Sequence, residues 1–178
     1  EVDVWEAINL ANQHPRINIL NPGPGVGGHC IAIDPWFLIH AVSQMPELLV
    51  ASRQLNDGMP QYVTDKVLSV MGQHGIGKPK VAALGMAYKA NVDDPRESPS
   101  IEVVHHLLDA GCEVLAFDPF IAEGINVPLA PTLEASLQDA DCIVLLTNHA
   151  VFQEILPEKA AALVSQRVVV DKRRFFSR

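Results

Sequence analysis

A glycine-rich stretch that ends in a cysteine holds the residues with the clearest potential for chemistry. Gly25, Gly27 and Gly28 precede Cys30, and Asp34 follows the cysteine by about one helical turn. Glycines let a ligand or another part of the chain approach the backbone closely, so they predict a shaped loop that presents the thiol. A thiolate near the start of a helix can act as a nucleophile. The alternative role for the cysteine is a small buried hydrophobic residue in a tight turn.

The residues after this loop indicate helices. Asp34 is a favoured N-cap residue, and Pro35 suits the first helical position, where the missing N–H of proline costs nothing. Over residues 36–71 the apolar side chains recur at helical spacing, with two prolines and one glycine as interruptions. We therefore expect two or three helical segments in that range, and a shorter amphipathic helix over residues 2–13.

Strands and helices alternate in the second half of the chain. Apolar runs predict strands over 81–87, 113–117, 142–146 and 167–171, and helical patterns predict helices over 99–110, 133–140 and 158–165. This alternation predicts an α/β fold, in which a helical segment is followed by a doubly wound, mainly parallel Rossmann-like sheet. Residues 73–80 form the expected linker, which divides the chain into domains at 1–73 and 80–178.

A polar loop follows the first expected strand. In an open parallel sheet the ligand crevice lies beyond the carboxyl ends of the strands, so Tyr88, Lys89 and Arg96 of this loop are candidate ligand residues. Lysine and arginine can both meet a phosphate, arginine through two parallel hydrogen bonds. The alternative is a solvated loop with an ion pair between Asp94 and Arg96. The loop lacks the Gly-x-Gly-x-x-Gly pattern, which argues against a standard dinucleotide site here.

Composition argues against several classes of function. The 178 residues carry a net charge of -8 without a basic stripe, which argues against binding of nucleic acid. No apolar run approaches the length of a membrane span. The three cysteines lack the close spacing of a disulfide scaffold or a zinc site, and they fit a reducing cytoplasm. Cys112 and Cys142 read as structural, and adjacent His105 and His106 on a helix point in different directions, so no metal site is expected.

These motifs resemble those of the UDP-glucose/GDP-mannose dehydrogenase family. Residues 23–34 are similar to its Pro-Gly-x-Gly-x-Gly-Gly loop with a catalytic cysteine and an aspartate four residues later. Residues 84–100 resemble its Gly-x-Ala-(aromatic)-Lys and Asp-x-Arg-Glu-Ser segments, in the same order along the chain. The residues around His29 and Asp34 look most like those of members that oxidise UDP-N-acetyl-D-mannosamine, and UDP-glucose is the alternative substrate.

The resemblance implies roles for the candidate residues. Cys30 would form thiohemiacetal and thioester intermediates with the sugar, and Asp34 would orient or activate the water that hydrolyses the thioester. The glycine loop, Tyr88 and Lys89 would line the UDP-sugar, and Arg96 would reach toward NAD. In the family NAD is held mainly by an N-terminal Rossmann domain, whereas this sequence resembles only the end of the central region and the C-terminal UDP-binding domain.

The resemblance also implies an assembly. His14 and Arg16 stand where related enzymes send a basic residue into the neighbouring subunit, and the helices of the first 71 residues resemble the region through which the family dimerises. A homodimer or a higher homo-oligomer is therefore expected. The sequence begins at Glu1 inside a helical pattern, so we expect a piece of a longer protein that is inactive alone. A non-catalytic nucleotide-binding or dimerisation module of the same fold is the alternative.

Overall fold

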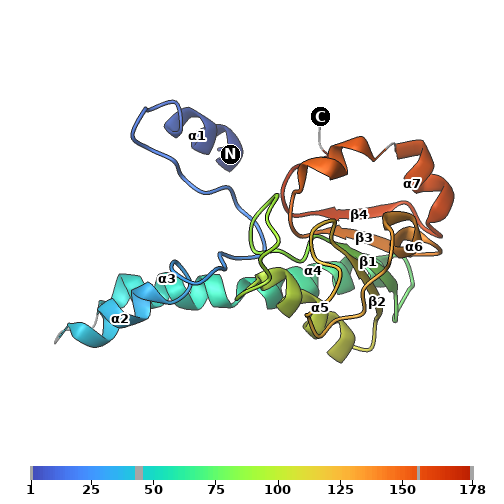
Figure 1. The fold of residues 1–178 in the computed structure, drawn as a ribbon, viewed down its shortest axis with the longest axis horizontal. Helices are drawn as coiled ribbons and strands as arrows, with labels where there is room; N and C mark the ends of the chain where they lie inside the picture. The colour runs from blue at the N-terminus through green and yellow to red at the C-terminus, as the bar shows by residue number, and fades with distance from the viewer. Residues whose placement is uncertain (1, 43–45, 156, 177–178) are drawn as a thin grey trace.

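A sheet of four parallel strands lies at the centre of the second half of the chain (Figure 1). The computed structural model describes residues 2–42, 46–155 and 157–176. The strands are β1 (Lys80–Leu84), β2 (Glu113–Phe117), β3 (Cys142–Leu145) and β4 (Val168–Asp171). They lie in the order β2-β1-β3-β4, and every pairing is parallel, with Ala82 between Leu115 and Ile143. This arrangement confirms the predicted α/β fold class.

Helices cover both faces of the sheet (Figure 1). The core of one face is shared with α4 (Met59–Gln73) and α5 (Pro99–Asp109), and that of the other with α6 (Leu133–Leu137), the 3₁₀ helix η1 (Ala150–Glu154) and α7 (Pro157–Leu163). Val67 and Val103 pack with Val81 on the first face, and Leu137 and Phe152 pack on the second. Burial on both faces explains why the central strands β1 and β3 are continuous apolar runs in the sequence.

The first strand is shorter than the predicted 81–87 range, and Gly85 is the reason. Its φ is +89°, and a Cβ at this position would lie 2.5 Å from the carbonyl oxygen of Thr147. The chain therefore leaves the sheet directly after Leu84, at a point where only glycine fits. Met86 and Ala87 remain fully buried and begin the loop that follows. The apolar run predicted correctly that these two residues are buried, but it predicted wrongly that they belong to the strand.

The first half of the chain is helical. It contains α1 (Val4–Ala11), α2 (Asp34–Ala41) and α3 (Glu47–Asp57), and α4 follows α3 directly. The expected range 36–71 thus divides into three helices, near Pro46 and at Gly58 as predicted, and its residues 43–45 lie outside the described residues. Across the described residues the longest helix has 15 residues, and none is long and apolar enough to cross a membrane.

Candidate functional site

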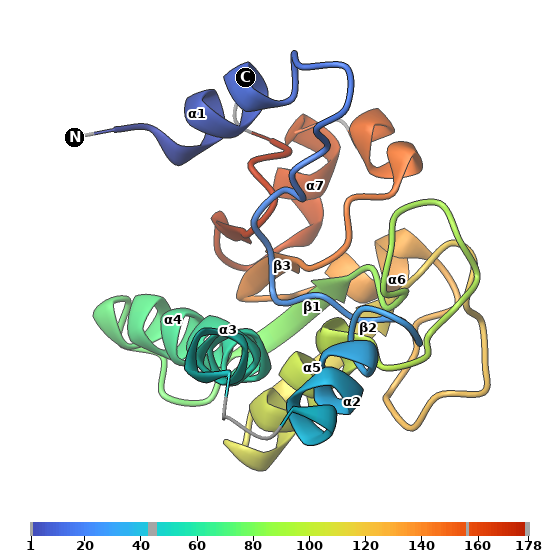
Figure 2. The ribbon, with the colours of Figure 1, turned by 90° about the vertical axis from the view of Figure 1, so that its left-hand side faces the viewer.

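The strand order reverses between β1 and β3, because the chain passes from β1 to β2 on one side while β3 pairs on the other. In such sheets the ligand crevice lies at the carboxyl ends of these two strands. The β1–α5 loop (residues 85–98) starts there. The cysteine loop (residues 21–33) runs across the same edge (Figure 2), where Gly23 lies against the guanidinium of Arg173. Arg173 in turn donates from Nε to the carbonyl of Leu146, at the end of β3 (2.8 Å).

The cysteine loop is packed directly on the backbone of the β1–α5 loop. A Cβ on Gly27 would overlap the carbonyl oxygen of Glu97 and would lie 2.7 Å from Cδ of Pro99. The N–H of Gly28 donates to the carbonyl oxygen of Arg96 (3.3 Å). These contacts leave no room for a side chain at Gly27, and they show that the two loops that carry the candidate residues are in direct contact.

Two side chains of α3 also hold the cysteine loop. Asn56 accepts the N–H of Val26 (2.8 Å) and donates to the carbonyl of the same residue (3.4 Å). Arg53, only 8% exposed, donates from Nη1 to the carbonyl of Ile31 (3.4 Å) and pairs with Asp57. Sequence reasoning missed both residues, and their signal was a polar pair three residues apart on one helix face.

Cys30 is exposed near the end of this loop, four residues before the first residue of α2. Its carbonyl accepts the N–H groups of Ile33 (3.0 Å) and Asp34 (2.8 Å). Asp34 is therefore the first residue of α2 and Ile33 occupies the N-cap position, so the prediction of Asp34 as N-cap is wrong by one residue. A backbone carbonyl closes this turn in place of a side chain. Asp34 remains in the first helical turn, and it is exposed like the cysteine.

Arg96 forms the ion pair with Asp94 that was predicted as the alternative for this loop. Its Nε lies 2.9 Å from Oδ1 and its Nη2 lies 2.6 Å from Oδ2. The side-chain hydrogen bond from Arg96, followed by that from its backbone N–H, lowers the pKa of Asp94 to about 2. The Arg96 side chain is still 63% exposed, so part of its guanidinium remains accessible.

Tyr88 and Lys89 precede this ion pair in the β1–α5 loop. A Cβ on Gly28 would lie 2.9 Å from the Tyr88 ring, and one on Gly25 would lie 3.2 Å from the ring of Pro99. Lys89 is exposed beside Tyr88. The hydrogen bond to Asp94 is the main cause of the raised pKa of Arg96. Electrostatic interactions with the nearby Tyr88 and Cys30 raise it by a smaller amount. The structure thus brings the predicted glycines, thiol, tyrosine and cations to one edge of the sheet.

His14 and Arg16 are not part of this arrangement within the described residues. They lie exposed in the turn after α1, where the N–H of Arg16 donates to Nδ1 of His14 (3.2 Å). Among residues 2–42, 46–155 and 157–176, neither side chain forms a hydrogen bond or ion pair with the cysteine loop or the β1–α5 loop. Their role toward a neighbouring subunit stays a prediction.

A buried polar pair beneath the β1–α5 loop was also missed. The side chain of Asp118 is 0% exposed, and so is that of His149, which lies 3.0 Å from it. The carboxylate accepts five hydrogen bonds, from the N–H groups of Met86, Ala87, Phe120 and Ile121 and from Nε2 of His149. The available signal was a polar residue shortly after each of two strands, β2 and β3.

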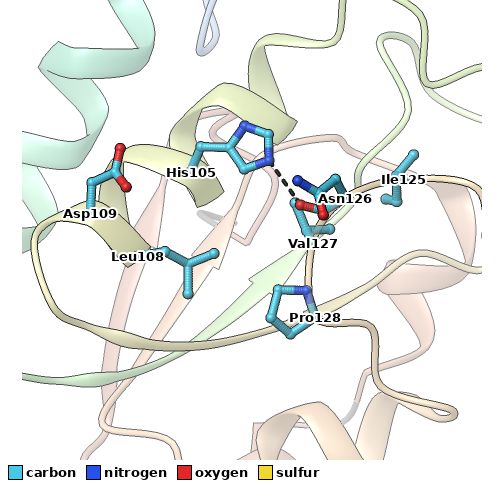
Figure 3. A pocket seen from close by; sticks show the side chains of 7 residues that line it. All are labelled: His105, Leu108, Asp109, Ile125, Asn126, Val127 and Pro128. Carbon is cyan, nitrogen blue, oxygen red and sulfur yellow. Dashed lines mark hydrogen bonds between the residues drawn. The ribbon is translucent and has the colours of Figure 1, made fainter.

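A separate hollow of about 610 Å³ lies beside the second half of α5 (Figure 3). Its wall includes His105, Asp109 and residues 125–128, and Nε2 of His105 donates to the carbonyl of Asn126 (2.9 Å). None of its lining residues belongs to the cysteine loop or the β1–α5 loop, so we do not assign it to the candidate site. In the part of the chain that the structure describes, no three His, Cys, Asp or Glu side chains group closely enough to hold a metal ion.

Two models of one protein family match this chain. Residues 82–178 match the UDP binding domain of the UDP-glucose/GDP-mannose dehydrogenase family, and residues 1–58 match its central domain. A UDP-N-acetyl-D-mannosamine dehydrogenase of Methanococcus maripaludis is 51% identical over 154 residues, which are 86% of this chain and 35% of that protein. An NDP-N-acetyl-D-galactosaminuronic acid dehydrogenase of Ralstonia nicotianae is 41% identical over 99% of this chain and 41% of its own length.

Solved structures agree with these matches. The UDP-D-ManNAc dehydrogenase from Pyrococcus horikoshii superimposes with a TM-score of 0.85 and 31% identity, over 98% of this chain and 41% of that one. This chain therefore spans between 35% and 41% of the length of these three relatives. Because the matched models and the glycine, cysteine and Arg-Glu-Ser motifs agree, this chain belongs to the UDP-glucose/GDP-mannose dehydrogenase family.

Proposed function

We propose that this chain is the part of an NAD-dependent nucleotide-sugar 6-dehydrogenase that holds the UDP nucleotide and the reactive cysteine. The observation that carries the proposal is the packing of the cysteine loop on the β1–α5 loop, at the edge where the strand order reverses. This packing supports a single site that includes Cys30 and Lys89. Relatives named for UDP-N-acetyl-D-mannosamine favour that substrate, which would be oxidised to the uronic acid.

Cys30 is the residue that we assign to covalent chemistry. The C6 alcohol of the sugar first loses a proton and a hydride and becomes an aldehyde. The Cys30 thiolate then adds to this aldehyde and forms a C–S bond, and the thiohemiacetal anion becomes a thioester when it loses a second hydride. Water then breaks the C–S bond, which releases the carboxylate and returns the thiol. Asp34, in the first turn of α2, would take a proton from that water. NAD, when bound, accepts the hydrides, and the exposed guanidinium of Arg96 is the group of this chain that would face it.

Binding of UDP tests this proposal. In calorimetric titrations we expect the 178-residue chain to bind UDP and UDP-N-acetyl-D-mannosamine, because Lys89 can pair with a phosphate. A hydrogen bond to a charged group contributes about 1.5–3 kcal/mol, so Lys89→Ala should weaken UDP binding by roughly 10- to 150-fold. Lys78→Ala is the matched control, because this exposed lysine precedes β1 at the opposite edge of the sheet.

The same titrations can overturn the proposal. UDP that does not bind, or that binds equally well to the Lys89→Ala variant, would show that the β1–α5 loop is not the nucleotide site. We also propose that these residues by themselves bind NAD weakly and do not turn over, since the family match covers only its central and UDP-binding domains. Steady formation of NADH by this chain would contradict that part.

Alkylation tests the role of the cysteine. Cys30 is exposed, whereas burial raises the pKa of Cys112 and raises that of Cys142 to about 12. We expect iodoacetamide near neutral pH to modify Cys30 alone, and bound UDP-N-acetyl-D-mannosamine to slow this reaction, as measured by mass spectrometry. A Cys30→Ser variant should stay unmodified. Equal reactivity of all three thiols would favour a non-catalytic module of the same fold.

We infer a homodimer or higher homo-oligomer from the first part of the chain. Large apolar side chains stand exposed on its helices, among them Leu10, Phe37 and Leu48, and exposed apolar surface of this kind marks interaction sites. In this proposal residues 1–73 assemble and carry the cysteine, and residues 80–178 bind the UDP-sugar. A sedimentation mass equal to one chain would contradict the assembly. The three free cysteines are consistent with the cytoplasm as its location.

A further inference from the structure

His149 is fully buried beneath the β1–α5 loop, and no step of the proposed reaction uses it. It follows β3 by four residues, and its ring lies between those of Phe120 and Phe152, with centroid distances of 5.1 and 5.6 Å. A polar ring in such surroundings is unfavourable unless its nitrogens have hydrogen-bond partners. Each nitrogen of His149 has one, and the two partners belong to different segments of the chain.

These hydrogen bonds fix the protonation of the ring. The backbone N–H of Asn91 donates to Nδ1 (2.9 Å), so Nδ1 carries no proton. The single ring proton is therefore on Nε2, which donates to Oδ2 of Asp118 (3.0 Å). His149 is thus a neutral ring that connects a buried carboxylate to the backbone N–H of Asn91. Asn91 has a φ of +60°, in the left-handed region that asparagine adopts more readily than most other residues, and the hydrogen bond to His149 helps to fix this conformation.

The residues that His149 and its partner hold lie on both sides of Lys89. Oδ2 of Asp118 also accepts the N–H groups of residues 86–87 (2.6 and 3.0 Å), on one side of the lysine. His149 holds Asn91 on the other side, two residues beyond the lysine. A single buried pair therefore fixes the backbone at both ends of the short segment that presents the ammonium group.

We propose that His149 is a positioning residue for Lys89: it holds the backbone around the lysine so that the ammonium group meets a phosphate of the UDP. This inference rests on the proposed UDP site. Its physical basis is that a fixed backbone removes the ordering cost that a mobile lysine loop would add to binding. Loss of the two hydrogen bonds should leave the sheet intact and weaken the nucleotide contact.

Two variants separate hydrogen bonding from packing. His149→Phe keeps an aromatic ring between Phe120 and Phe152 and removes both hydrogen bonds, and His149→Gln keeps one acceptor and one donor on neighbouring atoms of its amide. By calorimetry we expect His149→Phe to weaken UDP binding by about 10-fold and His149→Gln by less than about 3-fold. Equal losses in the two folded variants would overturn the proposal, because the hydrogen bonds would then not matter.

A double-mutant cycle shows whether the effect passes through the lysine. In the Lys89→Ala background, His149→Phe should change UDP affinity by less than about twofold, because its contribution acts through the missing ammonium group. Additive losses would overturn the positioning role and leave the UDP site in place. Absence of UDP binding to the unaltered chain, or binding that ignores Lys89→Ala, would overturn the UDP site itself.

A measurement on the unaltered chain covers the case in which His149→Phe does not fold. The ¹⁵N chemical shifts of the His149 ring should show a neutral ring with its proton on Nε2, both before and after UDP is added. A ring that is charged, or that carries its proton on Nδ1, could not accept the N–H of Asn91 and would overturn the proposal. Circular dichroism spectra identify which variants are folded for the binding comparison.

Discussion

Replacing Gly27 by alanine will separate the cysteine loop from the β1–α5 loop. The added Cβ would overlap the carbonyl oxygen of Glu97 and would lie 2.7 Å from Cδ of Pro99, and real Cβ atoms do not come this close. Neither neighbour is the free end of a flexible side chain. Glu97 itself has a φ of +47°, so its backbone has little freedom to move aside. The loop that carries Cys30 must therefore shift.

Two losses should follow from Gly27→Ala. Inserting a methyl group into a closely packed site costs roughly 1–3 kcal/mol, which should appear as a lower free energy of unfolding in urea titrations. The displaced Cys30 should also lose its protection, so bound UDP-N-acetyl-D-mannosamine should no longer slow its alkylation. Both measurements use the same protein, and together they distinguish a displaced loop from general unfolding.

Gly72→Ala is the matched control. Gly72 lies in the last turn of α4. Apart from its chain neighbours and the backbone of its own helix, no atom of the described residues lies within 4 Å of the position that its Cβ would take. Alanine is favoured over glycine in a helix by roughly 0.5–1 kcal/mol, so this variant should be slightly more stable and should keep the protection of Cys30. An alanine at position 27 that behaves like the one at position 72 would show that the two loops do not touch.

The fold was predictable because its strands and helices carry their pattern locally. The central strands β1 and β3 are buried and the edge strands β2 and β4 are partly buried. All four stand out in the sequence as apolar runs separated by helical patterns, which is enough to expect a parallel sheet with helices on both faces. The glycines before Cys30 and the polar residues after β1 marked both loops of the site. Strand ends were less certain, since Gly85 ends β1 through a contact with Thr147, which is distant in sequence.

The residues that hold the site in place could not be predicted from local sequence. Asn56 bonds to the backbone of Val26, 30 residues away, and His149 bonds to the backbone of Asn91, 58 residues away. A polar side chain that bonds to a distant backbone group has no periodicity or motif of its own. Such residues become visible only when the fold brings the two segments together, whereas residues that face a ligand cluster in exposed loops.

Asp118→Asn should destabilise the folded chain more than Gly27→Ala does. Both carboxylate oxygens of Asp118 accept N–H groups, Oδ2 from residues 86–87 and His149, and Oδ1 from residues 120–121. The amide of asparagine has one oxygen, so either orientation turns its NH₂ group toward N–H donors. An unsatisfied buried donor costs about 1–3 kcal/mol, and at least two are created, so we expect a loss of roughly 3 kcal/mol or more.

The pH dependence of this loss provides an independent check. Burial raises the pKa of Asp118, but the hydrogen bonds from His149 and from the N–H groups of residues 120 and 87 outweigh it, so the pKa falls below its ordinary value of 3.8. A carboxyl group with a lowered pKa stabilises the folded state at neutral pH, and this contribution disappears as the pH falls through the folded pKa. The asparagine variant has no such contribution to lose.

We would measure the free energy of unfolding by urea titration, at neutral pH and at the lowest pH where the unaltered chain stays folded. The difference between the unaltered chain and Asp118→Asn should be smaller at the low pH. The free energies of unfolding of the unaltered chain and of Asp118→Asn should approach each other as the pH falls below 3.8. Asp65→Asn is the control, because this exposed carboxylate accepts one hydrogen bond, from Gln61, and its loss should stay within about 0.5 kcal/mol. A difference for Asp118→Asn that does not change with pH would mean that the native carboxylate is not held ionised by its donors, and that packing alone explains its burial.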